Sequence, residues 1–580
     1  MYRNHSAHGL RALLLIGVSA VSLTAAQAAD MYSGGLKDSP AYVPYNWTGF
    51  YAGMQSGAAV GTADVHDPYG NAIFGDSART AGGFTGGQIG YNYQFGRTVA
   101  GIEAEANWAD LEGTTTCFGV SGLFLPANCG VHVNSFGTLT ARLGQTLGPD
   151  ERTLVYAKGG AAWENRHVNM ILNNFDPVTA TSSDQTNWGW TAGAGVEYGL
   201  TPRWSVRFEY DYMNFGTGNA TSPNGGFVDT PTGLPVRISQ DLHSFLVGVN
   251  YRPNGAGAPW ELPGAPGSLK DPMPSYAGGW GVEVGTRYMY SWGRFQKDMG
   301  LLKTDPVPAS DLISRLTYDG MHTNSGELFA RIDTPSSIFV KGLIGTGSTF
   351  DGKMNDEDFN IGGALQLYSN TLSPKVDGDI QYGIIDVGYD FLHGRDYKVG
   401  SFVGGGFFNQ SMKAFGCAPI AAGNCIPNTP TSGSPSITED DKWAALRIGS
   451  VVEIMLSNRL KLTGEAAYLP YVSFTGTDHH YFGNTGVLAE TFPESANGGQ
   501  GAQIEAMLSY AATEHWNIGV GGRYWAMWTK DGAWNCTFGC PGVPTAPQHF
   551  KAAAEQAGVL GQLSYKFGGA YEPLPSAPLK

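Results

Sequence analysis

Residues 204–212 alternate strictly between two kinds of side chain, and this alternation constrains the fold more than any other feature of the chain. The apolar and polar sets are Trp204, Val206, Phe208, Tyr210 and Tyr212 against Ser205, Arg207, Glu209 and Asp211. A side-chain period of two indicates a β-strand, because successive residues of a strand point to opposite faces. Charged side chains on one face need water or one another, so we expect that face to line a polar lumen while the aromatic face meets lipid. A soluble β-sandwich, the alternative, would bury the aromatic face.

The same design recurs along the chain as an alternating segment, a short turn, a second alternating segment and a long polar loop. Residues 45–252 divide into eight such segments. Residues 278–568 divide into ten, at 278–296, 310–332, 335–350, 378–394, 396–415, 439–456, 458–475, 496–512, 514–530 and 552–567. A transmembrane strand needs about 9–11 residues. We therefore predict an all-β chain that forms two tandem transmembrane antiparallel β-barrels, of about eight and ten strands.

Residues 253–277 separate the two blocks and are rich in proline and glycine. Proline cannot donate to a strand ladder, so a semi-stiff linker is expected here. The competing arrangement, one barrel of eighteen strands, would need continuous strand pairing across this break. Residues 569–580 are again rich in proline and are expected to form a tail after the last strand.

The first 28 residues have the parts of a secretory signal peptide. Basic residues open the chain, residues 12–25 are mostly apolar, and Ala26-Gln27-Ala28 is a small-residue cleavage signal, so the first barrel domain is expected within residues 29–252. A charged fraction of only 15% with 83 glycines suits strands packed against lipid. The net charge of −15 argues against a nucleic-acid partner, which would need a basic stripe.

The parity of the strands predicts the orientation. A barrel with an even number of strands has both ends on one side of the membrane, and export with short turns places those ends in the periplasm. The expected location is the bacterial outer membrane, with the long loops extracellular and the termini and the linker periplasmic. The expected partners are outer-membrane lipid and lipopolysaccharide.

Six cysteines fall into three close pairs: Cys117 and Cys129, Cys417 and Cys425, and Cys536 and Cys540. In an exported chain this even count predicts three disulfides that staple loops. No histidine or second cysteine pair lies at zinc-like spacing, which weighs against a metal site at any of them.

The first block resembles the Omp25/Omp31-like porin family of outer-membrane proteins. The segments that carry the resemblance are 46–53 (NWTGFYAG), 86–96 (GGQIGYNYQFG), 140–144 (TARLG) and 190–198 (WTAGAGVEY). The resemblance implies an eight-stranded barrel with a structural, envelope-tethering or surface role. Eight strands leave an interior just wide enough for their own side chains, so a channel for bulk solutes is not expected.

The second block carries two acidic motifs in segments expected to be outer loops. Asp356 and Asp358 follow the third predicted strand, and Asp478 and His480 follow the seventh. Taken singly, an Asp-x-Asp loop is usually a solvated surface or a weak cation site. Together, the acid pair (Asp356 and Asp358) and the dyad (Asp478 and His480) can face each other across a barrel mouth. A carboxylate that orients an imidazole makes it a general base for water, and opposing carboxylates can position that water.

The second block is similar to the omptins, the outer-membrane endopeptidases with ten-stranded barrels. The similarity rests on 314–318 (SRLTY), on 345–348 (GTGS) leading to the acid pair, and on Asp478-His479-His480-Tyr481. It implies that His480 is the base, that Asp478 orients it, and that activity on a peptide or protein substrate requires lipopolysaccharide. It implies no role for His479 and no other cofactor or metal.

Two positions of the specificity pocket depart from the omptin pattern, and Phe359 stands where the family has a tryptophan after the acid pair. Family members that cut beside basic residues carry one acid two positions before the dyad aspartate, where this chain has Gly476. They carry a second acid on the first strand of the barrel, at or near the position of Gly293 in this chain. The basic-residue preference is therefore not carried over. Two hypotheses remain: an omptin-like endopeptidase barrel fused to a small structural barrel, or a non-enzymatic structural, adhesion or porin-like protein that keeps an inactive omptin-like scaffold.

Overall fold

The structure is a computed structural model. It describes residues 45–66, 77–117, 127–148, 150–172, 180–221, 235–253, 280–302, 312–359, 368–393, 397–421, 435–482, 487–538 and 548–567. All regular secondary structure assigned in these ranges is β-strand. Within them there is no helix that is long and apolar enough to cross a membrane. The predicted signal peptide and tail, and the predicted linker apart from Pro253, lie outside the described residues.

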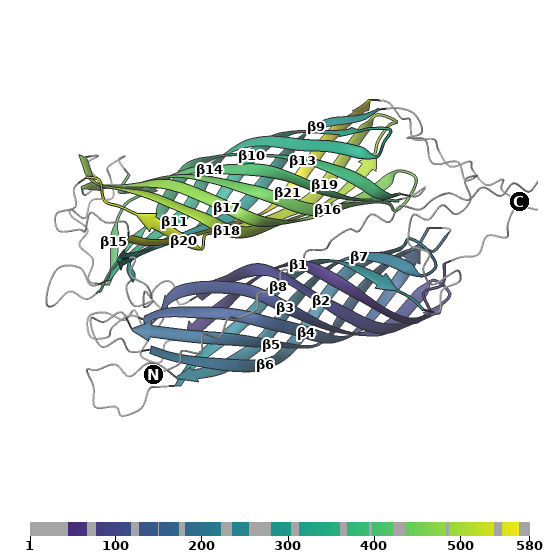
Figure 1. Cartoon of the computed structure of the whole chain (residues 1–580), viewed down its shortest axis with the longest axis horizontal. Helices are drawn as coiled ribbons and strands as arrows, with labels where there is room; N and C mark the ends of the chain where they lie inside the picture. The colour runs from purple at the N-terminus through teal and green to yellow at the C-terminus, as the bar shows by residue number, and fades with distance from the viewer. Residues whose placement is uncertain are drawn as a thin grey trace, which may run out of the picture. The chain divides into compact units, whose positions relative to one another are not determined.

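The first barrel is formed by eight antiparallel strands that pair in chain order and close through β1 and β8 (Figure 1). The strands are β1 (Gly49–His66), β2 (Ser77–Phe95), β3 (Thr98–Cys117), β4 (Ala127–Leu147), β5 (Thr153–Leu172), β6 (Ala180–Gly199), β7 (Trp204–Thr221) and β8 (Pro235–Tyr251). Closure leaves no free sheet edge, so every strand has a hydrogen-bonded neighbour on each side.

The second barrel has ten long strands in its wall, closed by the pairing of β10 with β11. The wall strands are β9 (Gly281–Leu302), β10 (Leu312–Asp333), β11 (Ile338–Phe359), β13 (Lys375–His393), β14 (Tyr397–Phe415), β16 (Ile437–Met455), β17 (Leu460–Phe482), β18 (Val487–Ala511), β19 (Trp516–Trp528) and β21 (Gln548–Phe567). Short strands β12 (Tyr368–Ser373), β15 (Ala418–Ala421) and β20 (Asp531–Trp534) extend this sheet. The predicted fold class is confirmed, and the single barrel of eighteen strands is wrong.

Short turns gather at one end of each barrel, which we call the turn end, and long connections at the other, the loop end. Thr334–Ser337 joins β10 to β11, and residues 512–515 join β18 to β19. Because the strand number of each wall is even, the first and last strands of each barrel both meet the rest of the chain at its turn end.

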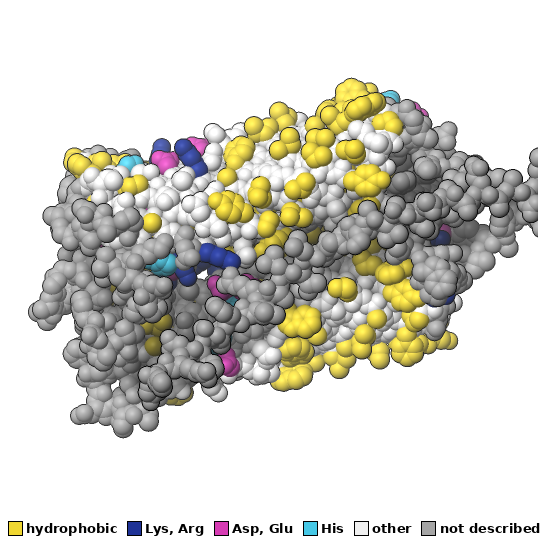
Figure 2. Space-filling view, viewed as in Figure 1, with side chains coloured by type: hydrophobic (Ala, Val, Ile, Leu, Met, Phe, Trp, Pro, Cys, Tyr) yellow, Lys and Arg dark blue, Asp and Glu magenta, His cyan; other side chains and the backbone are white. Residues whose placement is uncertain are grey.

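Exposed apolar side chains cover the outer walls, and Figure 2 shows them spread over the strands. In the second barrel, each wall strand contributes to this apolar belt, through Trp292, Leu328, Ile344, Ile385, Val403, Leu446, Tyr468, Leu508, Ile518 and Val559 among others. Because the same strands turn polar side chains inward, this is the wall that a lipid bilayer requires.

The lumen of the first barrel is filled by a buried ion-pair network. Arg207 is fully buried, and its Nη1 lies 2.7 Å from Oε2 of Glu103. The Lys158 ammonium lies 2.6 Å from Glu209 and 3.4 Å from Asp211. The prediction that the charged face of residues 204–212 turns inward is confirmed, since Arg207, Glu209 and Asp211 are all buried.

The lumen of the second barrel is layered. Ion pairs such as Arg331–Glu453 lie toward the turn end, and Arg523–Glu505 and Arg447–Glu465 lie farther up the lumen. A large apolar cluster that includes Phe295, Trp443, Phe474 and Phe550 lies next. The candidate catalytic residues are at the loop end, where this cluster continues beside them: the ring centroids of His480 and Phe492, a member of the cluster, are 5.2 Å apart.

Cys117 and Cys129 form the predicted disulfide, which joins β3 to β4. Cys417 and Cys536 are also disulfide-bonded, and none of the described cysteines is free. Their predicted partners, Cys425 and Cys540, lie outside the described residues.

Candidate active site

The acid pair and the dyad lie at the loop end of the second barrel, outside the apolar belt. On β11 both members of the acid pair follow Phe350, the last exposed large apolar side chain of that strand. On β17 the dyad likewise follows Tyr471. These four side chains therefore lie beyond the part of the wall that faces lipid.

The four residues do not lie in loops, and this part of the prediction is wrong. Strand β11 runs to Phe359 and β17 to Phe482, whereas the sequence placed the ends of these strands at residues 350 and 475. The reason is physical. Beyond the belt no lipid selects apolar side chains on the outer face, so the period-two signal fades while backbone pairing continues. The pairing of Asp478 with Glu439 and of Asp356 with Leu316 shows this continuation.

A β-bulge turns the acid pair into the lumen. Between Asp319 and Thr323 the pairing of β10 with β11 shifts, at Gly320 with φ 63° and Gly352 with φ 144°. Before the shift, the odd-numbered Phe339 belongs to the buried apolar cluster of the lumen; after it, the even-numbered Met354 does. The odd-numbered Glu357 is also buried, but it accepts a hydrogen bond from Tyr368 of β12. An extra residue in a strand exchanges its two faces. Asp356 and Asp358 consequently face the same side as Met354.

The dyad is preorganised on one strand. Residues i and i+2 of a strand share a face, and Nε2 of His480 lies 3.0 Å from Oδ2 of Asp478. The carboxylate is fully buried, and the imidazole is 23% exposed toward the loop end. His479 lies between them on the outer face, where Nδ1 contacts the Thr491 hydroxyl at 3.1 Å.

The acid pair and the dyad lie on opposite walls of one lumen. In the ring of ten wall strands, β13, β14 and β16 separate β11 from β17 on the shorter side. Burial and then the charge of Asp358 raise the pKa of Asp356, and the charge of His480 acts against this rise. Burial raises the pKa of Asp358 too, again against His480. The two pairs are thus close enough to influence each other's protonation.

The dyad favours an imidazolium at neutral pH. Burial alone would lower the pKa of His480, but the Asp478 carboxylate, its hydrogen bond and the charge of Asp356 raise it to about 10. The same ion pair lowers the pKa of Asp478. Chemically, the pair can hold a proton and release it to a leaving group, and it becomes a base as the pH rises.

Lys297 lies in the candidate site, although no sequence motif pointed to it. Its ammonium crosses the lumen from β9 and lies 2.6 Å from Glu439, 2.8 Å from Asp478 and 2.8 Å from Glu494. The alternation of β9 signals that Lys297 faces inward, in phase with Glu283 and Arg287. No local pattern, however, gives its partners, which lie on β16, β17 and β18.

The lumen beside the dyad is acidic, although Gly476 stands where some omptins carry an acid. Gly476 pairs with Asp441 on β16 and with Glu494 on β18. A Cβ atom at Gly476 would lie 2.7 Å from Oδ1 of Asp441. The absence of an acid at residue 476 therefore leaves room for a carboxylate from the neighbouring strand, so acidity at this place cannot be judged from β17 alone.

Comparisons with known proteins show which family the first barrel is similar to. The model of the outer membrane protein beta-barrel domain matches residues 13–252. The 31 kDa outer-membrane immunogenic protein of Brucella melitensis is 33% identical over 257 residues, which cover 42% of this chain and 100% of that protein. The chain belongs to the outer-membrane β-barrel protein family. The resemblance to the Omp25/Omp31-like group is confirmed, and the 25 kDa outer-membrane immunogenic protein of the same species is 27% identical over 36% of this chain and 80% of its own length.

Two solved structures of outer-membrane proteins are similar to parts of this outer-membrane β-barrel protein. The outer membrane protease OmpT of Escherichia coli is 14% identical, with a TM-score of 0.40, over 50% of this chain and 97% of its own. Ail, the attachment invasion locus protein of Yersinia pestis, is 13% identical, with a TM-score of 0.17, over 35% of this chain and 99% of its own. At these TM-scores neither likeness bears on function.

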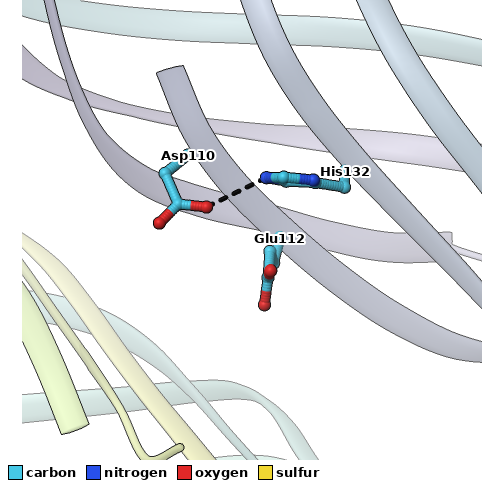
Figure 3. Close-up of side chains that lie close together, drawn as sticks. All are labelled: Asp110, Glu112 and His132. Carbon is cyan, nitrogen blue, oxygen red and sulfur yellow. Dashed lines mark hydrogen bonds and ion pairs between the residues drawn. The ribbon is translucent and has the colours of Figure 1, made fainter. Parts of the chain in front are cut away.

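A second cluster of polar side chains lies on the first barrel of this outer-membrane β-barrel protein. Asp110, Glu112 and His132 each place a ligand-type atom within 4.8 Å of the others (Figure 3). Nε2 of His132 lies 2.9 Å from Asp110, and Glu112 pairs with His132 across β3 and β4. Both carboxylates are exposed, so solvation accounts for the cluster without a metal ion.

Proposed function

We propose that the second barrel is a surface endopeptidase of the omptin kind, in which the dyad activates water opposite the acid pair. The observation that supports this most is that two short motifs more than a hundred residues apart face the same lumen at its loop end. A barrel wall kept only as scaffold does not require a buried carboxylate to orient a partly exposed imidazole.

The geometry supports a single catalytic cycle. Asp478 holds Nε2 of His480, which leaves Nδ1 to take a proton from water. The water oxygen then attacks the carbonyl carbon of a peptide bond, and the proton passes from the imidazole to the departing amine. Asp356 and Asp358, on the far wall, position the water or the substrate. No metal ion enters this scheme.

We also propose roles for the rest of the molecule. The belt of the second barrel binds outer-membrane lipid and lipopolysaccharide, the loop end faces the outside of the cell, and the turn end faces the periplasm. The first barrel is a structural or surface element, because its lumen is filled by paired charges such as Arg207 with Glu103. The substrate is a peptide or protein segment that reaches the loop end from outside.

The experiment that tests the function compares two neighbouring histidines. Refolded protein with lipopolysaccharide should cleave members of an unfolded peptide library. His480→Ala should reduce the rate by about 10²–10⁴-fold, the range that loss of a general base costs. Products are measured by mass spectrometry, which also maps the cleaved bonds.

His479→Ala is the matched control, since it removes the same side chain from the outer face of the same strand. It should cleave at the wild-type rate. Equal activity in all three proteins, or no activity in any, would contradict the proposal and favour a non-enzymatic structural, adhesion or porin-like role.

A further inference from the structure

Lys297 occupies an acidic recess next to the dyad. We call the carboxylates of Glu439, Asp441, Asp478 and Glu494 the recess; all four side chains are buried. The Lys297 ammonium has three N–H donors, and it lies within hydrogen-bond distance of three of these carboxylates. Lys297 is itself fully buried, between Phe295 and Met299 on the inward face of β9.

The recess has more binding capacity than Lys297 uses. It holds four carboxyl groups against one ammonium. One oxygen of each carboxylate that contacts Lys297 has no hydrogen-bond partner among the described residues: Oε1 of Glu439, Oδ1 of Asp478 and Oε2 of Glu494. The hydroxyl of Tyr318 is also buried and lacks a partner there, and burial and then the charges of Glu439 and Asp478 raise its pKa.

This arrangement has the chemistry of a binding site for a primary ammonium group, and the Lys297 side chain occupies it. Buried carboxylates are costly unless a cation pairs with them, and a primary ammonium on an apolar stem is the cation that this recess holds. The recess adjoins the dyad, because Oδ2 of Asp478 contacts both Lys297 and His480. A substrate side chain beside the scissile bond would approach the same place from the loop end.

We infer that Lys297 fills, from within the chain, a binding site for a primary ammonium group beside the dyad, and so closes this site to the lysine side chains of substrates. The inference rests on the proposed function for its consequence on specificity, but not for the existence of the recess. In the wild-type protein a lysine beside the cleaved bond is then disfavoured. Removal of Lys297 converts the site into one that takes a basic residue.

The recess is tested without any activity measurement. Lys297→Ala leaves Asp478 with only the His480 imidazolium and leaves Glu439 and Glu494 without the ammonium that they contact. It also opens the space of the lysine stem, so its unfolding temperature should fall. n-Propylammonium should restore much of that loss, whereas tetramethylammonium, which carries the same charge without an N–H donor, should not. Lys297→Met is the matched variant: it fills the stem without charge, and n-propylammonium should not stabilise it.

Refolding yield replaces the unfolding temperature if Lys297→Ala does not fold alone, and n-propylammonium should then raise that yield selectively. Equal responses of the alanine and methionine variants to n-propylammonium, or equal effects of the two cations on Lys297→Ala, would overturn the recess as an ammonium site.

Specificity is tested with the peptide library. Lys297→Ala should raise cleavage beside lysine relative to cleavage beside uncharged residues by at least about tenfold, the order that one charge-assisted hydrogen bond supplies. Wild-type cleavage that favours lysine at the cut bond would contradict the inference. Selective stabilisation by n-propylammonium with no cleavage by either protein would overturn the proposed function and, with it, the specificity consequence, while the ammonium site would stand.

Discussion

A single carboxylate oxygen, Oδ2 of Asp478, lies 3.0 Å from the imidazole of His480 and 2.8 Å from the ammonium of Lys297. The two contacts act in opposite directions on the histidine: Asp478 raises the pKa of His480, and the charge of Lys297 lowers it. The basicity of the dyad is therefore set by residues from β9 and β17, and not by the Asp-x-His motif alone. The Asp478 carboxylate thus orients the imidazole, and the Lys297 ammonium weakens its effect on the pKa of His480.

The raised pKa of His480 predicts the pH dependence of the proposed cleavage reaction. The imidazole is a base only when it has lost its proton, which happens as the pH rises toward about 10. We expect the cleavage rate to increase from pH 7 into the alkaline range, as measured with a fluorogenic peptide at constant ionic strength.

The same shift affects stability with the opposite sign. A pKa raised in the folded state stabilises the fold fully below the unfolded value of about 6.5, and this contribution disappears as the pH rises through the folded value. Unfolding measured in parallel at each pH therefore separates catalysis from loss of the fold. A rate that declines steadily from pH 6 to pH 9 in intact protein would rule out His480 as the base.

The strand β11 shows how one irregularity in an element decides what the element does. The part of β11 that faces lipid and the part that carries the acid pair have opposite side-chain phases, because the bulge at Gly320 and Gly352 lies between them. Without the bulge, the acid pair would lie on the outer face and Asn355 and Glu357 would face inward. The backbone at Gly352, with φ 144°, belongs to a region that other residues rarely adopt.

Gly352→Ala should therefore destabilise the loop end of the barrel and reduce activity together. Its Cβ atom would meet Met321 at 3.1 Å, and the backbone strain costs of order 1–3 kcal/mol. The unfolding free energy and the cleavage rate are the two measurements.

Gly326→Ala, on β10, is the matched control for Gly352→Ala. It has no atom within 4 Å of its Cβ position and no positive φ, so it should leave both quantities within error. Full activity of Gly352→Ala at unchanged stability would show that the bulge does not set the direction of the acid pair.

Across the whole molecule, both lumens are filled, but by different means. The first barrel holds paired charges such as Lys158 with Glu209, and the second holds a large apolar cluster around Phe474 between its charged layers. Filled lumens favour rigid walls that present their loop ends, and they disfavour the passage of solutes.

The expected outcome of a liposome-swelling assay is thus no uptake of small sugars above the rate of protein-free liposomes. A general porin reconstituted at the same protein-to-lipid ratio supplies the positive control. Swelling at the rate of that porin would show that at least one lumen opens in a bilayer, and would favour a pore function.

Much of the fold was determined by the sequence alone, because a lipid wall on one side and a polar lumen on the other impose a period of two on every strand. Residues 204–212 gave their faces correctly for this reason, and the strand number of each barrel followed from counting such segments. The dyad, too, could be paired from sequence, since residues two apart on one strand share a face.

Only the tertiary structure decided the rest of the site. The strand ends at Phe359 and Phe482 were not predicted. Alternation of apolar and polar side chains is required only where the outer face meets lipid, and these ends lie beyond the belt. Lys297 and its three carboxylates come from four strands whose neighbourhood is created by closure of the barrel, and the nearest of these carboxylates in the chain is Glu439. Contacts across a lumen depend on the order of the strands around the barrel and on their register. Neither can be deduced from the residues next to each contacting side chain in the sequence.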